Sequence, residues 1–196
     1  RGGLRTVTFE VADSFGVSVP ADFGAFIEVN KTSEFTISTS SSMNLAPGER
    51  TITFTIDNNG NFEDTFTIST DSLNGWFGNA DPVTVSFDSS SDFDLTVTVP
   101  HVAAGIQDTW SVSAVAANDV TVEDSVADTL VVDTVTGHTL TGDTDLSGNP
   151  GDTVTYHFTI LNTGNAQEKM DYTVSSSWAI STPGGSTTLG MGASDT

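Results

Sequence analysis

Apolar and polar residues alternate with a period of two along several short stretches of the chain. Such stretches begin at Thr6, Thr51, Phe93 and Trp110. A period of two places the apolar side chains on one face of an extended strand and the polar ones on the other. Sheets with one apolar face stack about 10 Å apart over a shared core. The pattern therefore predicts an all-β fold of antiparallel sandwiches.

The composition favours strands and tight turns over helices. Of the 196 residues, 36% are hydrophobic, and Ser, Thr, Asp, Asn and Gly are abundant among the others. The sequence has no long stretch rich in Ala, Leu, Glu, Lys and Arg, the residues that form helices most readily. A chain of this length accommodates two modules of about 100 residues each.

One sequence motif occurs twice, at positions about 104 residues apart. A Pro-Gly pair precedes a strand-like stretch around Phe54, which leads to Asn58–Asn61. A second Pro-Gly pair precedes a similar stretch around Phe158, which leads to Asn162–Asn165, and each copy then reaches a tryptophan. Landmarks in the same order at near-constant spacing indicate a duplicated module.

Both copies of the motif contain the turn sequence Asn-x-Gly-Asn. We interpret Asn58–Asn61 and Asn162–Asn165 as turns between strands in which the glycine adopts a positive φ, and the first as a hairpin turn. Large aromatic residues in sandwiches usually fill the core. Trp76 and Trp178 are therefore expected to be buried.

The two modules end differently. The first continues through Phe93–Val99 and a Pro-containing turn to a strand from Trp110, whereas the second reaches Ser194–Thr196, which aligns with Ser91–Phe93. The second module is therefore predicted to lack its last strands. The stretch Gly3–Val11 resembles the missing ending. The expected domains are residues 1–22, a strand or hairpin that completes a neighbouring module, then 23–133, a complete module, and 134–196, an incomplete one.

Two arrangements follow from matching ends. Either the chain is one stretch of a long array of such modules, or separate copies polymerise. In a polymer, the N-terminal strand of one copy enters the open groove of another. The plain alternative is that Val7–Val11 packs on its own first module and the C-terminus is a truncation. The residues expected to fill the groove are Val7, Phe9, Val11, Phe15, Val17 and Val19.

A family resemblance rests on these motifs. Pro150–Tyr156 followed by Asn162–Asn165 resembles the conserved-repeat β-sandwich domains of archaeal and bacterial surface proteins, and Leu95–Pro100 with the Trp110 strand resembles their closing hairpin. The motif is also similar to repeats beside carbohydrate-binding modules and to camelysin-like biofilm fibre proteins. The resemblance covers about 36–115 and 146–178. It implies tandem immunoglobulin-like sandwiches at the cell surface, with a spacer, stalk or fibre role and no catalytic residues.

The charge balance narrows the choice of partners. Asp and Glu number 26 against 5 Lys and Arg, a formal net charge of −21. So acidic a chain repels nucleic acid and anionic lipid. Its acidic surface either keeps the chain soluble in high salt or collects cations, or it serves ordinary solubility alone. The chain has no Cys, which excludes disulfides and thiolate chemistry. No apolar run approaches the roughly 20 residues of a membrane span.

Few residues suggest chemistry. None of the three histidines lies beside a candidate nucleophile, so we expect no enzyme activity and no obligatory cofactor. The segment that begins at Asp143 is either a plain turn or a calcium-binding loop. It has oxygen ligands at alternate positions, but the glutamate expected at the twelfth position of such a loop is absent. Asn30-Lys31-Thr32 is an N-glycosylation acceptor sequence. The candidate calcium ligands are Asp143, Asp145, Ser147 and Asp152.

Taken as a whole, the sequence predicts an extracellular structural protein whose partners are copies of itself. The alternative is an adhesin or a carbohydrate-binding accessory module of a secreted protein. A binding module should show a row of aromatic side chains facing solvent. We expect the three tryptophans at core positions, which favours the structural role.

Overall fold

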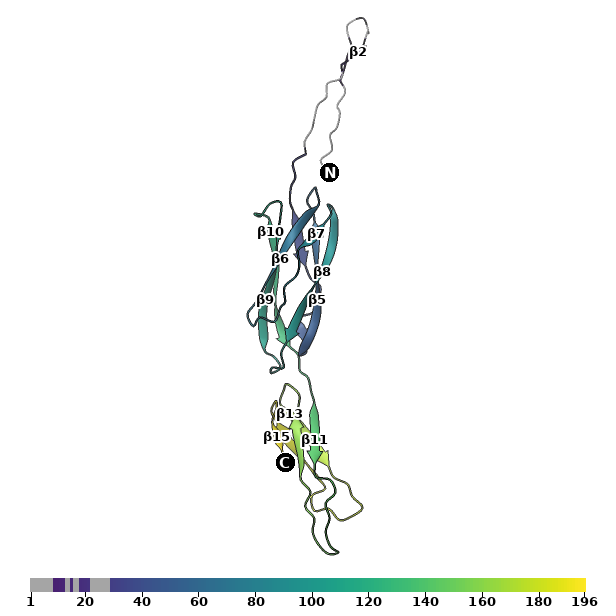
Figure 1. The fold of residues 1–196 in the computed structure, drawn as a ribbon, viewed down its shortest axis with the longest axis vertical. Helices are drawn as coiled ribbons and strands as arrows, with labels where there is room; N and C mark the ends of the chain where they lie inside the picture. Colours follow the sequence, from purple (N-terminus) through teal and green to yellow (C-terminus); the bar gives the residue numbers. More distant parts are fainter. Residues whose placement is uncertain (1–8, 13–14, 16–17, 22–28) are drawn as a thin grey trace.

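The computed structural model of the chain describes residues 9–12, 15, 18–21 and 29–196. All regular structure within these ranges is β-strand. Accordingly, no described segment has the helical length and hydropathy of a membrane span. The all-β prediction is confirmed, and the strands form sandwich-like modules in tandem (Figure 1).

The first module is a sandwich of a three-stranded sheet, in the order β3-β5-β8, and a five-stranded sheet, in the order β4-β10-β9-β6-β7. Its pairings are antiparallel except that of β4 with β10, which is parallel. The strands are β3 (Phe35–Ser38), β4 (Asn44–Leu45), β5 (Gly48–Asn58), β6 (Asp64–Ser72), β7 (Val83–Val85), β8 (Ser89–Val99), β9 (Gln107–Ala116) and β10 (Glu123–Val132).

The inner faces of these two sheets form one core. Ile52, Phe54 and Ile56 on β5 are buried, as their alternation with threonines predicts. Trp110 on β9 stacks on Phe77 with ring centroids 5.0 Å apart and meets Phe54 edge-on at 5.8 Å. Strand β9 therefore supplies the aromatic centre that joins the two sheets.

The second module repeats part of this arrangement with the same register. Phe35 pairs with Asn58 in the first module, and His138 pairs with Asn162 in the second. The β6–β7 and β5–β8 pairings recur about 104 residues later as β13–β14 and β12–β15. The second module contains β11 (His138–Gly142), β12 (Phe158–Asn162), β13 (Glu168–Thr173), β14 (Gly184–Leu189) and β15 (Ser194–Asp195).

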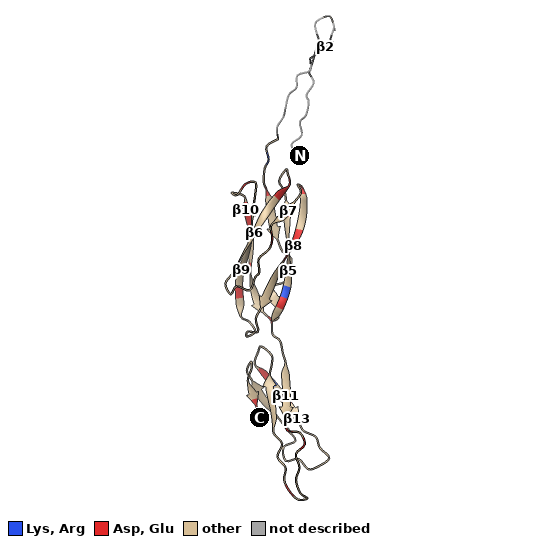
Figure 2. Cartoon of the chain, viewed as in Figure 1, with Lys and Arg blue, Asp and Glu red and all other residues tan. Residues whose placement is uncertain are grey.

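This correspondence shows what the second module lacks. Its five strands match β3, β5, β6, β7 and the beginning of β8, and none of its described strands matches β9 or β10. The predicted tandem of sandwiches, with the second one incomplete, is therefore confirmed. Acidic residues occur in both modules (Figure 2).

The N-terminal segment contains a hairpin of its own. Strand β1 (Phe9–Ala12) pairs antiparallel with β2 (Ser18–Ala21), and these two strands join no other described sheet. Figure 1 shows this hairpin apart from the first sandwich. Phe9, Val11 and Val19 lie in its strands, and Phe15 in its turn is exposed. Val7 and Val17 lie outside the described residues.

Three local predictions were wrong. Asn58–Asn61 is not a hairpin turn, because it connects β5 to β6 and these strands belong to different sheets. Gly60 and Gly164 do not adopt a positive φ. Trp178 was expected in the core but is 84% exposed, whereas its counterpart Trp76 packs against the core of the first module.

Equivalent substitutions in the two modules should therefore have unequal effects. Phe54→Ala removes a fully buried ring and should lower the free energy of unfolding by about 3–5 kcal/mol. Phe158→Ala, at the matching position, should lower it by less than about 1 kcal/mol in the isolated chain, because that ring is 41% exposed. Guanidinium unfolding followed by circular dichroism measures both, and equal losses would contradict the open second module.

Candidate functional site

The second module exposes apolar side chains at positions that the first module buries. Ile37 is 6% exposed and its counterpart Leu140 is 63% exposed, while Ile52 is 2% exposed and its counterpart Tyr156 is 48% exposed. The rings of Tyr156 and Phe158 are stacked, with centroids 6.3 Å apart. We call the following set of exposed apolar residues the open face: Leu140, Tyr156, Phe158, Tyr172, Val174 and Trp178.

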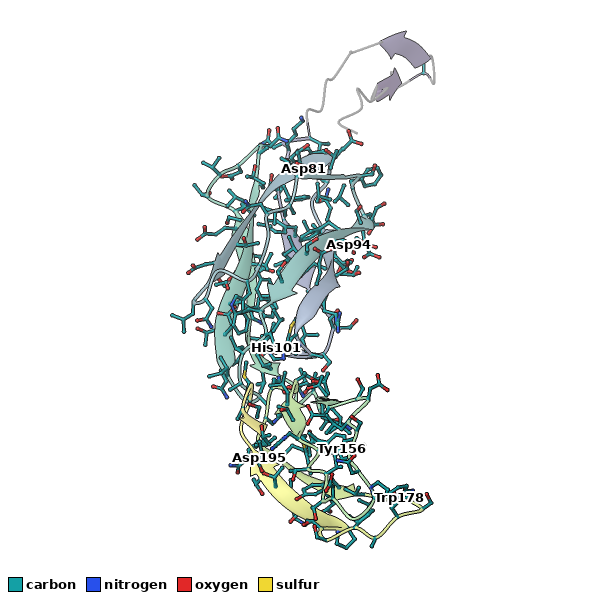
Figure 3. All side chains as sticks on the ribbon, turned by 60° about the horizontal axis from the view of Figure 1, so that its bottom comes forward. Asp81, Asp94, His101, Tyr156, Trp178 and Asp195 are labelled. Atoms are coloured by element: carbon teal, nitrogen blue, oxygen red, sulfur yellow. The ribbon has the colours of Figure 1, made fainter. Side chains whose placement is uncertain are left out.

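The open face begins where strands corresponding to β9 and β10 would pack. In the first module, β9 brings Trp110 and Val112 into the core, and both are buried there. Figure 3 shows Tyr156 and Trp178 on the second module, with Trp178 projecting outward. The apolar positions that remain covered in the second module, Met170 and Leu189, lie on the β13–β14 pair.

Backbone pairing is also incomplete in the second module. Strand β6 lies between β7 and β9, whereas its counterpart β13 pairs with β14 alone among the strands that the structure describes. Strand β5 pairs with β8 over its full length, Gly48–Asn58, whereas β12 pairs with β15 only at Ile160 and Leu161. The second module therefore presents a sheet edge where the first has a paired strand.

A carboxylate at the start of β13 lacks the partners that its counterpart has. Asp64, at the start of β6, is buried and accepts hydrogen bonds from Asn118 Nδ2 at 2.7 Å and Ser33 Oγ at 2.7 Å. Asn118 lies in the turn between β9 and β10. At the matching position, Oε2 of Glu168 is inaccessible to solvent and has no hydrogen-bond partner. The β9–β10 turn thus supplies a polar contact as well as apolar packing.

The electrostatics of Asp64 reflect these contacts. Burial by itself would raise the pKa of the Asp64 carboxyl. The hydrogen bonds from Asn118, Ser33 and the Thr65 N–H outweigh burial and hold that pKa below its usual value. The charged form of this carboxylate is therefore the one that the folded first module stabilises.

The first asparagine of each Asn-x-Gly-Asn turn holds the corner between the two sheets. Asn58 Nδ2 donates to the carbonyl oxygens of Phe62 and Val85, both at 2.9 Å. Asn162 Nδ2 donates to Ala166 O at 2.8 Å and Leu189 O at 2.9 Å. Each side chain therefore bonds the turn segment that leads into the next strand and also the edge strand beside that strand, which explains the same residue in both copies.

The last asparagine of each turn holds the segment that enters its module. Asn61 Oδ1 accepts from Thr32 N at 3.0 Å, and Nδ2 donates to Asn30 O at 2.8 Å. Asn165 contacts Val135 N at 2.7 Å and Asp133 O at 2.8 Å in the same way. This role was not predicted from the sequence, although the recurrence of both asparagines about 104 residues apart indicates a shared structural role.

The glycines of these turns are required by close approach of the entering segment. A Cβ at Gly60 would lie 2.6 Å from Thr32 O, and one at Gly164 would lie 2.5 Å from Val135 O. Real side chains do not tolerate such distances to backbone atoms, so only glycine fits without movement. The reason for glycine at these positions is therefore the close approach of the entering segment and not a positive φ.

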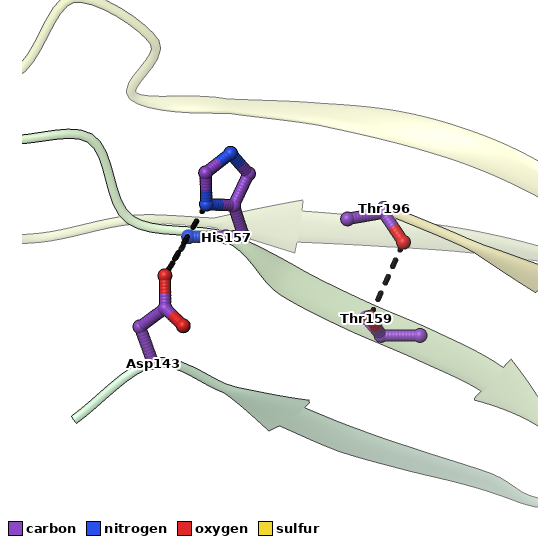
Figure 4. A network of polar contacts seen from close by, with 4 residues as sticks. All are labelled: Asp143, His157, Thr159 and Thr196. Carbon is purple, nitrogen blue, oxygen red and sulfur yellow. Dashed lines mark hydrogen bonds and ion pairs between the residues drawn. The ribbon is translucent and has the colours of Figure 1, made fainter.

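Two of the predicted calcium ligands have other contacts. Asp143 accepts a hydrogen bond from His157 N at 2.9 Å and lies 3.3 Å from His157 Nδ1 (Figure 4). The backbone N–H of His157, followed by its ring, lowers the pKa of the Asp143 carboxyl. Asp152 accepts from Asn149 N at 2.8 Å. In the described part of the chain, no three His, Cys, Asp or Glu residues gather as metal ligands, and calcium binding by Asp143, Asp145, Ser147 and Asp152 stays a prediction.

Two further contacts lie at the surface, one of them at the predicted glycosylation site. Asn30 is exposed and its carbonyl oxygen bonds Asn61, and glycosylation of its side chain stays a prediction. Thr159 Oγ1 on β12 lies 3.2 Å from Thr196 Oγ1, so the segment that follows β15 stays beside β12 (Figure 4).

Comparisons with known proteins place the fold only in broad terms. No protein-family model matches the chain, and no curated protein matches it. Two similar solved structures are a chaperone–tip adhesin complex of CFA/I fimbriae biogenesis and the class 5 fimbriae chaperone CfaA. They are 12% and 14% identical to this chain, each with a TM-score of 0.39, and the match covers 83% of this chain and 84% of each of theirs.

A third similar structure is the sporulation control protein Spo0M from Bacillus subtilis. It is 10% identical, with a TM-score of 0.36, and the match covers 70% of this chain and 69% of that protein. These likenesses are distant similarities between β-rich folds.

The lowered pKa of Asp64 gives a pH dependence with a definite sign. Its contribution to the free energy of unfolding is fully present above the ordinary value of 3.8 and is lost as pH falls through the lower folded-state pKa. Asp64→Asn should destabilise the first module at pH 7 and flatten the fall in its stability below pH 3.8. Urea unfolding across that range measures this. The exposed Asp81→Asn is the matched control and should keep the wild-type profile.

Proposed function

We propose that this chain is a structural, non-catalytic subunit of an extracellular filament or surface stalk, assembled head to tail from copies of itself. The observation that carries the proposal is the open face of the second module, together with the incompletely paired strand β13. In the assembly, the N-terminal hairpin of one copy packs on the second module of the preceding copy. That hairpin takes the place that β9 and β10 occupy in the first module.

The antiparallel pairing within the hairpin, the same as that of β9 with β10, supports this placement. In the first module, β9 and β10 form an antiparallel pair, with Val112 opposite Val126. In the N-terminal hairpin, β1 and β2 form an antiparallel pair, with Val11 opposite Val19. The sequence of β1 alternates apolar and polar residues as that of β9 does. One strand of such a hairpin can pair with β13 while its apolar positions cover the open face.

Burial of the open face favours assembly. Moving one large apolar side chain from water into a core contributes roughly 1.5–3 kcal/mol. The open face has six apolar side chains that are 36–84% exposed in the single chain, so each gains part of that amount on burial. Association costs an estimated 4–15 kcal/mol in lost motional freedom, so the apolar gain and the association cost are of similar size. The hydrogen bonds along β13 therefore help to decide whether the complex is stable.

The distribution of charge also fits this pairing. The chain as a whole is strongly acidic, so copies repel one another at low salt. Two of its five basic residues, Arg1 and Arg5, lie in the N-terminal segment, while residues 134–196 have one basic residue, Lys169. The segment proposed to dock is thus less acidic than the module that receives it. Salt that screens the remaining repulsion should promote assembly.

A second candidate function has one observation in its favour. Tyr156 and Phe158 are stacked and exposed, and Trp178 is exposed on the same module. Exposed aromatic rings can also bind the apolar faces of sugars, as an adhesin or carbohydrate-binding module requires. The assembly proposal is preferred because the same positions are core positions in the first module, which indicates a missing sheet partner.

Deletion of the N-terminal segment should abolish assembly. The variant that lacks residues 1–20 should form no filaments under conditions in which the full chain does, because nothing then covers the open face. Negative-stain microscopy and sedimentation measure this, and circular dichroism should show that the first module stays folded. Unchanged filaments in the deletion variant would refute the hairpin's role. A full chain that stays monomeric and binds sugars on a glycan array would support the second candidate.

Trp178 should report burial of the open face directly. It is 84% exposed in the single chain, so its fluorescence should shift to shorter wavelength when copies assemble. Trp178→Phe is the matched control, because it retains an aromatic ring but removes the reporter, and it should assemble without that shift. A wild-type spectrum that does not change on assembly would show that the hairpin packs elsewhere.

A further inference from the structure

We propose that Asn61 fixes the joint between copies in the same way that Asn165 fixes the joint between the two modules of one chain. The inference rests on the proposed function, since it concerns successive copies in a filament. It adds a contact surface, around Asn61 on the first module, and assigns its partner. That partner is the second module of the preceding copy, once the N-terminal hairpin has completed it.

The joint within one chain shows how the contact is made. Asn165 is fully buried, and its side chain bonds Asp133 and Val135 in the connection between the modules. Its backbone N–H donates to Val135 O at 2.9 Å, and its own carbonyl oxygen accepts from Ala104 N at 3.0 Å. Ala104 belongs to the loop between β8 and β9 of the first module. One residue therefore bonds both the connection and the preceding module.

The same clamp is already formed in front of the first module. Asn61 bonds Asn30 and Thr32 through its side chain, and its backbone N–H donates to Thr32 O at 3.2 Å. The adjacent backbone bond also recurs, with Asn59 N donating to Glu34 O at 2.9 Å. The segment that leads from the N-terminal hairpin thus enters the first module as the segment after β10 enters the second.

The two clamps differ in burial. Gly164 and Asn165 are buried, whereas Gly60 is half-buried and Asn61 is exposed. Asn165 is covered because the β8–β9 end of the first module packs on it through Ala104. The surface around Asn61 is therefore the counterpart of an existing module–module contact. The partner that fits it is another module of this kind, and the proposed assembly places one there.

The consequence is that joints within and between copies have one geometry. Each joint has an asparagine with two side-chain bonds to the entering segment and a glycine against which that segment packs. In a filament built in this way, the structural repeat along the axis is one module. The longer repeat of two modules, set by the length of one chain, differs from it only slightly. Bending at either kind of joint must break the same hydrogen bonds.

The clamp itself can be tested in the single chain. Asn165→Ala should raise the hydrogen-exchange rate of the Val135 amide about tenfold or more, because its acceptor at 2.7 Å is lost. Asn61→Ala should do the same to the Thr32 amide, whose acceptor lies at 3.0 Å. Asn59→Ala, in the same turn, is the control and should change neither rate. If Asn61→Ala impairs folding, Asn61→Asp keeps the acceptor and removes only the donor to Asn30.

The joint between copies is tested in filaments. Asn61→Ala and Asn165→Ala filaments should both bend more than wild-type filaments, with similar losses of persistence length in electron micrographs. Asn59→Ala filaments should be as stiff as wild type. Stiff Asn61→Ala filaments beside flexible Asn165→Ala filaments would overturn this inference and leave the proposed function intact. A wild-type chain that forms no filaments would overturn both.

Discussion

A β-sandwich is stable only when both inner faces are covered and each interior strand has a neighbour, and this constraint governs the whole chain. In the first module, β9 satisfies both demands at once. It pairs with β6 and β10, and it places Trp110 against Phe54 and Phe77. In the second module no described strand corresponds to β9, and the side chains of Tyr156, Phe158 and Trp178 are exposed to solvent. The two modules share a sequence pattern, but only the first has strands β9 and β10 to cover its inner face.

The features that depend on local pattern could be predicted from the sequence. The alternation at Ile52, Phe54 and Ile56 identified a strand and its buried face, because a period of two has only one structural meaning in an extended chain. The recurrence of the motif about 104 residues later identified the second module and its missing strands. Both inferences compare residues that are close in sequence or equivalent by repetition.

The features that depend on distant contacts could not be predicted in the same way. Gly60 was assigned a positive φ because turns often need one, but Thr32 O, 28 positions earlier in the sequence, is what excludes a side chain. Asn58–Asn61 was read as a hairpin because nothing local reveals that β5 and β6 belong to different sheets. Trp178 was placed in a core that the described strands of the second module do not complete. In each case the deciding partner is remote in sequence or belongs to the proposed neighbour.

The parallel pairing of β4 with β10 has a mechanical consequence. A pull along the chain enters the first module before β3 and leaves it after β10, at the opposite end of the sandwich. Strands β4 and β10 run in the same direction, so the pull slides them past one another lengthwise. The bonds from Val131 N to Met43 O at 2.8 Å and from Asp133 N to Leu45 O at 2.9 Å then share the load and must rupture together. Resistance of this kind suits a protein that transmits tension along its length.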